Sequence, residues 1–94
     1  MLALSRRSGQ SIRFDPPGTV LTYKRPTRQG VLVSVKSPGK VSREIDIPNG
    51  LSTKIGEVEV SPQWANNHKA RLGFEAPEHI KIMRSELLTK GTEK

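Results

Sequence analysis

The sequence predicts a small all-β fold. Short runs in which apolar and polar residues alternate recur along the chain, and they are rich in valine and isoleucine. Proline, glycine and asparagine separate these runs, as in DPPG (15–18) and PNG (48–50), and such residues favour turns. With 94 residues the chain has the length of one domain and too little material for a large core.

Eight runs are expected to form strands. In chain order they are MLALSRR, QSIRF, TVLTYK, GVLVSVK, KVSREIDI, GEVEVS, KARLGFE and HIKIMR. The segment PQWANN (62–67) is expected to be a hairpin loop, because asparagine tolerates left-handed turn conformations. The segment SELLTKGTEK (85–94) predicts one short C-terminal helix that leads into a polar tail over residues 89–94.

The first predicted strand carries two adjacent arginines. Alternate residues of a strand share a face, so Arg6 lies on the face of Leu2 and Leu4, and Arg7 lies on the opposite face. The two arginines are therefore expected to leave the strand in opposite directions.

The composition favours a polyanionic partner. Lysine and arginine number 16 against nine acidic residues, which gives a net charge of +7. The excess comes from the first half of the chain, because the segment up to Arg43 contains many basic residues but a single acidic one, Asp15. Nucleic acid is the leading class of partner for such a chain, and a basic surface that is merely solvated is the alternative.

Several other classes lack support in the sequence. There is no cysteine, and no apolar run has the length of a membrane span or of a secretory signal, so a soluble cytoplasmic protein is expected. His68 and His79 have no paired-ligand spacing, so no metal or other cofactor is expected. Because no nucleophile elbow, P-loop or dinucleotide-binding pattern occurs, we expect neither an enzyme nor a small-molecule substrate.

Both ends of the chain resemble the CsrA/RsmA family of carbon storage regulators. MLALSRRSGQSIRF (1–14) resembles the opening of that family. Residues 55–88 resemble the rest of it through IGEVEV, an asparagine-rich turn and ARLGFEAPEHIKIMRSEL. The residues between, 15–54, have no counterpart there. The chain is therefore expected to be a single CsrA-like domain over residues 1–94 with a β-rich insertion at 15–54.

The resemblance implies both an assembly and a function. The implied assembly is a strand-swapped homodimer of small mixed or antiparallel sheets, in which the first and last strands of each chain pair with the partner chain. The implied function is RNA binding that regulates translation, through GGA motifs in hairpin loops of messenger or small RNA. A protein antagonist is a further candidate partner.

Carried over residue by residue, the resemblance also implies an RNA-binding surface. It combines the first strand of one chain with the last two strands of the other. Its residues are Leu4, Ser5, Arg6, Arg7, Arg71, Ala76, Pro77, Ile80, Ile82, Met83 and Arg84. Arginine can contact phosphates and guanine edges, and Arg84 is expected to contribute most.

Three residues depart from the pattern of the family. Met83 stands where the family usually has histidine, and Glu75 and Glu78 place negative charge on either side of Ala76 and Pro77. Repulsion of phosphate is expected to weaken GGA recognition here. The departures motivate an alternative function, a CsrA-like protein-interaction or oligomerisation module with weak, non-specific RNA binding.

Three features stay open at the level of sequence. The basic residues of 15–54 could form a second RNA-contacting surface or a solvated face. Trp64 could stack on a base, although packing over a sheet edge is the more common role. A weak similarity between Val31–Ile45 and Ala70–Leu87, centred on Ser37-Pro38 and Ala76-Pro77, could reflect a duplication or the general likeness of short hairpins.

Overall fold

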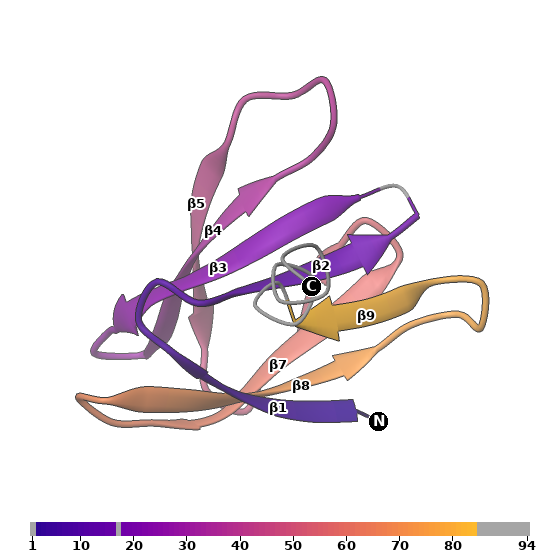
Figure 1. Ribbon diagram of the computed structural model, residues 1–94. Helices are drawn as coiled ribbons and strands as arrows, with labels where there is room; N and C mark the ends of the chain where they lie inside the picture. Colours follow the sequence, from indigo (N-terminus) through magenta and orange to yellow (C-terminus); the bar gives the residue numbers. More distant parts are fainter. Residues whose placement is uncertain (1, 17, 85–94) are drawn as a thin grey trace, which may run out of the picture.

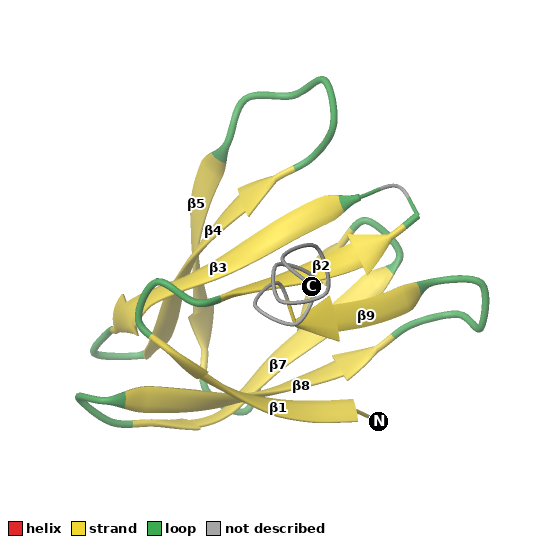
Figure 2. Cartoon of the chain, in the orientation of Figure 1, coloured by secondary structure: helices red, strands yellow, loops and turns green. Residues whose placement is uncertain are grey.

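The computed structural model describes residues 2–16 and 18–84, and all regular structure in them is β-strand (Figures 1 and 2). The strands form two sheets in which every pairing is antiparallel. This confirms the predicted all-β class. The predicted C-terminal helix and polar tail lie outside the described residues. Within those residues there is no helix of the length and apolarity needed to cross a membrane.

The first sheet has the strand order β1-β8-β7-β6, and the second has the order β5-β4-β3-β2-β9. The strands of the first sheet are β1 (Leu2–Arg7), β6 (Thr53–Ile55), β7 (Val58–Ala65) and β8 (Lys69–Glu75). The strands of the second are β2 (Ser11–Asp15), β3 (Thr19–Pro26), β4 (Gly30–Lys36), β5 (Arg43–Pro48) and β9 (Lys81–Arg84).

The core lies between the two sheets. Phe14 of β2 and Phe74 of β8 meet there edge to face, with ring centroids 5.8 Å apart. Alternate residues of β3 and β7, among them Leu21 and Val60, point into the same core and are fully buried. The apolar alternation that predicts the strands therefore marks the face that each strand buries.

Two predicted boundaries are wrong. PQWANN does not form a hairpin loop, because β7 continues to Ala65 and only the next three residues turn. The Asn66 side-chain oxygen closes this turn by accepting the N–H groups of His68 and Lys69 at 2.8 and 2.9 Å. The strand predicted from KVSREIDI begins only at Arg43.

Both end strands pair within the chain. β1 lies along β8, with Leu2 opposite Phe74, and β9 lies along β2, with Arg84 opposite Ile12. The resemblance implies that a partner chain supplies these pairings. In this structure each end strand has its neighbour in the same chain.

The two sheets repeat one arrangement of four strands. The hairpins β3–β4 and β7–β8 have equal strand lengths, and β3 and β7 have the same order of buried and exposed residues. Each hairpin has a register shift at the same place, between Tyr23 and Arg25 in one and between Pro62 and Trp64 in the other. β5 flanks β4 as β1 flanks β8, and β2 flanks β3 as β6 flanks β7. Strand β9 is the one addition to this repeat among the described strands.

The turns that precede β2 and β6 follow the same repeat. Gly9 and Gly50 have φ angles of 88° and 80°, in the left-handed region that favours glycine. Gly9 donates its N–H to the carbonyl of Tyr23 at 2.8 Å, and Gly50 donates to the equivalent carbonyl of Pro62 at 3.4 Å. The chain thus traces β1–β4 and then repeats that path in β5–β8. Residues 15–54 complete the first unit and begin the second.

This repeat bears on the similarity seen in the sequence. Val33 and Val35 of β4 occupy the register positions of Leu72 and Phe74 of β8, which supports a duplication over these strands. The similarity ends after the two prolines. β5 then returns along β4, whereas β9 crosses to β2.

A monomer is the expected state in solution, because both end strands already have partners within the chain. Size-exclusion chromatography with light scattering should give a mass near 10.4 kDa. A mass of twice that value at every concentration would instead indicate that strands are exchanged between two chains.

The only tyrosine, Tyr23, makes stability depend on pH. Its hydroxyl is buried without a hydrogen-bond partner among the described residues, and this burial raises the pKa of Tyr23 above 10.0. The free energy of unfolding should fall above about pH 10, where the unfolded chain releases this proton more readily than the folded one. Tyr23→Phe should remove this decrease and stabilise the protein by about 1 kcal/mol. Urea unfolding at neutral and alkaline pH measures both effects, and a destabilised Phe variant would show that the hydroxyl is bonded.

Candidate nucleic-acid interface

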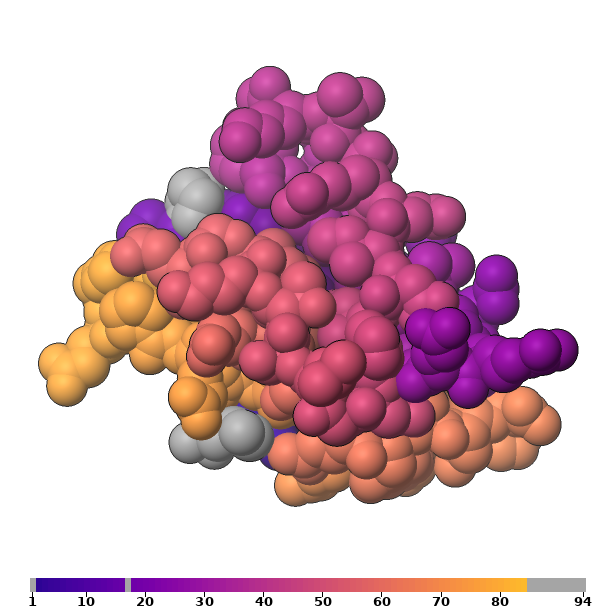
Figure 3. All heavy atoms as spheres, turned by 180° about the vertical axis from the view of Figure 1, so that it is seen from behind, coloured from indigo at the N-terminus to yellow at the C-terminus, as the bar shows by residue number. Residues whose placement is uncertain are grey.

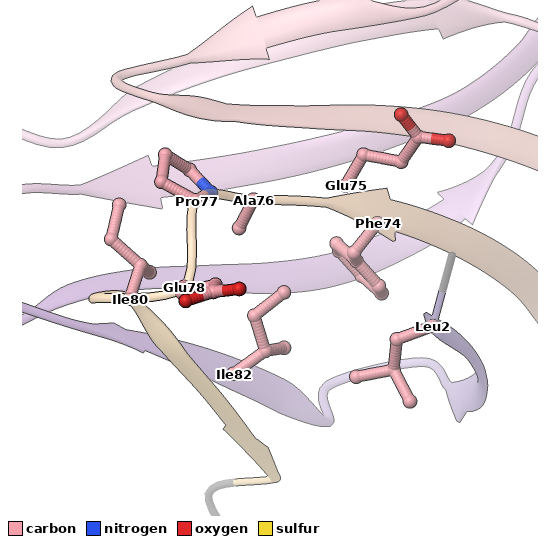
Figure 4. A pocket seen from close by; sticks show the side chains of 8 residues that line it. All are labelled: Leu2, Phe74, Glu75, Ala76, Pro77, Glu78, Ile80 and Ile82. Carbon is pink, nitrogen blue, oxygen red and sulfur yellow. The ribbon is translucent and has the colours of Figure 1, made fainter.

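An open pocket, here called the first pocket, lies between edge strands β1 and β9 at the turn that joins β8 to β9 (Figure 4). Its volume is about 540 Å³. Leu2, Phe74 and Ile82 face one another across it, and the carboxylate of Glu75 points to the other side of β8. The residues that line it are Leu2, Phe74, Glu75, Ala76, Pro77, Glu78, Ile80 and Ile82. The structure thus brings together Ala76, Pro77, Ile80 and Ile82 of the expected RNA-binding residues.

A second group of expected residues lies on the outer face of the first sheet. Ser5 stands opposite Arg71, and Arg7 stands opposite Lys69. All four side chains are exposed. They do not line the first pocket, so the expected surface is divided between the pocket and this face.

Trp64 belongs to the same outer face. It lies opposite Arg71 in the register of β7 and β8, is 39% exposed, and has the Lys69 ammonium 5.9 Å from its ring centroid. An exposed tryptophan beside cations is a common base-stacking arrangement. The sequence favours packing of Trp64 over a sheet edge, and the structure leaves this side chain only partly packed. The bulge between Pro62 and Trp64 places the Trp64 ring on this outer face. No pattern of residue types in the sequence predicts the bulge.

The two adjacent arginines do leave β1 in opposite directions. Arg7 is exposed, whereas Arg6 is 3% exposed. Arg6 donates from Nε to the Ser5 carbonyl at 2.7 Å and from Nη1 to the Ser11 carbonyl at 3.4 Å. Arg6 therefore links β1 to β2, which corrects the expectation that its side chain meets a phosphate. Leu4 likewise packs against the core.

The last two expected residues point to opposite sides of β9. Arg84 stands opposite Ile12 and shares the face of Ile82, whereas Met83 stands opposite Arg13 on the other face. Both are half-buried. Arg84 is thus on the side of β9 that borders the first pocket, and Met83 is turned away from it.

Acidic side chains gather beside the first pocket, at the turn between β8 and β9 and largely on the side of β8 that faces away from the pocket. This group is here called the acidic rim. Glu75 stands directly opposite Glu59, Glu78 lines the pocket, and Glu57 lies 3.1 Å from the His79 ring. The sequence identifies Glu75 and Glu78 as a source of repulsion for phosphate. Glu59 adds to it through its register with Glu75, and Glu57 adds to it from the turn before β7.

No group of three or more histidine, cysteine, aspartate or glutamate side chains is placed to hold a metal ion in residues 2–16 and 18–84. What the site offers is a pocket with apolar walls at Leu2, Phe74 and Ile82 and acidic side chains beside it, between two edge strands that carry arginines outside the pocket lining.

Comparisons with known proteins find no relative: no family model matches the chain, and no match is found among curated proteins or solved structures. The resemblance to the carbon storage regulators therefore rests on the sequence motifs alone.

The different roles of the two arginines can be tested by unfolding. Arg6→Ala should lower the free energy of unfolding by about 1–3 kcal/mol, because it removes buried packing and leaves two carbonyls without their donor. Arg7→Ala is the matched control and should change it by less than about 0.5 kcal/mol. Equal effects in urea unfolding would contradict the assignment of Arg6 as a structural residue.

Proposed function

We propose that the protein binds single-stranded RNA and regulates translation, with GGA in a hairpin loop as its preferred target. The observation that supports this best is the placement of the edge strands β1 and β9 on either side of the first pocket. Proteins read RNA sequence mainly in unpaired loops, whose base edges can bond to the free N–H and C=O groups of a strand edge.

Charge supports the same proposal. Arg7 on β1 and Arg84 on β9 place two guanidinium groups on the strands that border the first pocket, and the chain carries a net charge of +7. Guanidinium groups bind phosphates and the guanine edge in a bidentate manner. The choice of GGA comes from the resemblance of residues 4–7 and 76–84 to the family motifs.

The acidic rim of the first pocket favours a second candidate function. Glu57, Glu59, Glu75 and Glu78 gather around the turn between β8 and β9, and such a cluster attracts a basic protein partner. A protein-interaction module is therefore the alternative to RNA recognition at this surface.

A comparison of two RNA hairpins tests the proposal. The protein should bind a hairpin with GGA in its loop at least about tenfold more tightly than the same hairpin with a scrambled loop, a difference of about 1.4 kcal/mol. Arg84→Ala should abolish this preference, because a charged contact is lost. Lys81→Ala removes an equal charge from the same strand and should preserve it.

Each other result has a distinct meaning in this titration. Equal binding of the two hairpins would reject GGA recognition and leave only non-specific attraction. If neither hairpin binds, RNA binding itself is rejected in favour of the protein-interaction module.

A further inference from the structure

The internal repeat creates a second pocket at the position equivalent to the first. This second pocket lies at the turn between β4 and β5, a segment that projects from the rest of the molecule (Figures 1 and 3). Its volume is about 590 Å³. Val35 and Ser37 line the second pocket, and they are equivalent to Phe74 and Ala76 of the first pocket. Strand β5 borders the second pocket as β1 borders the first.

The charge of the second pocket is opposite to that of the first. Arg43 lines the second pocket from the register position of Leu2, and Lys36, on the face of β4 turned away from the pocket, occupies the register position of Glu75. Lys40 lines the second pocket and, like Lys36 and Arg43, is exposed. The second pocket, which repeats the first, is therefore bordered by basic side chains where the first is bordered by acidic ones.

The cations of the second pocket are not neutralised within the described part of the chain. No carboxylate among the described residues pairs with Lys40 or Arg43, the two cations that line the pocket. The nearest acids on β5 are on its opposite face. One of them, Asp46, already accepts a hydrogen bond from the Thr27 hydroxyl at 2.8 Å. Positive charge is thus left available for a ligand.

An apolar cavity adjoins the basic side chains of the second pocket. It has a volume of about 380 Å³ and shares Ser37 and Lys40 with the second pocket. Phe14, Ile55 and Val58 form its apolar walls together with Ile80. A cavity beside a cluster of cations fits a ligand that has a flat apolar part next to an anionic group, as a nucleotide does.

Val41 adds an exposed apolar contact. Its side chain is 91% exposed, whereas the residue that follows the other proline at the same spacing, Ile80, is 8% exposed. The difference arises because β9 continues from Ile80 into the second sheet, whereas β5 turns back along β4. The second pocket therefore keeps an apolar side chain in solvent beside its cations.

We propose that the second pocket binds a nucleotide of single-stranded RNA, with its phosphate at Lys40 and Arg43 and its base against the adjoining apolar cavity. The proposal rests on the proposed function for the class of ligand, but it concerns a different surface. It places the main phosphate-binding site in residues 40–43, outside the two segments that carry the sequence motifs.

Two matched charge reversals test this proposal. Lys40→Glu combined with Arg43→Glu alters the second pocket, and Lys24→Glu combined with Arg28→Glu makes the same change in charge at the other end of β3 and β4. All four side chains are exposed, so both variants should fold. With a labelled short single-stranded RNA that lacks GGA, the pocket variant should lose about tenfold or more in affinity and show a weaker salt dependence, and the control should lose about twofold.

A gain of binding provides the converse test. Leu2→Arg combined with His79→Lys gives the first pocket the cations of the second, and it should add a second equivalent of bound RNA in a stoichiometric titration. In the unaltered protein, amide resonances of residues 36–43 should shift on addition of the RNA. An acidic peptide of equal charge should not displace it.

The outcomes separate this proposal from the proposed function. Equal losses in the two charge reversals would indicate general electrostatic attraction and overturn the second pocket, as would displacement of RNA by the acidic peptide. Loss of binding only in Arg84→Ala would overturn the second pocket and retain the proposed function. An unaltered protein that binds no RNA at all would overturn both.

Discussion

The exchange of strands between the two halves of the chain is the interaction on which the rest of the structure depends. β1 of the first half completes the sheet of the second half, and β5 of the second half completes the sheet of the first. The pairing of Leu2 with Phe74 joins residues from nearly opposite ends of the sequence. Neither sheet can form without both halves, so folding must be cooperative over the whole described chain, with many non-local contacts.

The same exchange decides where the two pockets lie. Each pocket forms where an exchanged strand passes the turn that ends a β-hairpin, and its rim carries the residues of that turn. The backbone of the two sites is repeated, so their difference lies in side chains and in the strand that follows. Arg43 stands where the first pocket has Leu2, and Gly39 where it has Glu78, which changes the charge. β9 buries Ile80, whereas β5 leaves Val41 exposed.

Alternation along single strands could be predicted from the sequence, and pairing between distant strands could not. The opposite directions of Arg6 and Arg7 follow from a period of two, as do the strands β3 and β4. The neighbour of β1 could not be derived in this way, because strand partners are set by the packing of the whole chain. Glu59 joins the acidic rim through its register with Glu75, and Trp64 reaches the outer face through a bulge. Both effects have no local signature.

Placing the two halves on one chain removes a constraint that symmetry imposes. In an assembly of two identical chains every substitution occurs twice, so both sites must change together. Here Gly9 and Gly50 still keep the same turn, yet the neighbouring pockets have reversed their charge. A covalently joined repeat can keep one site for one task while selection adapts the other, and the shared backbone preserves the fold during that divergence.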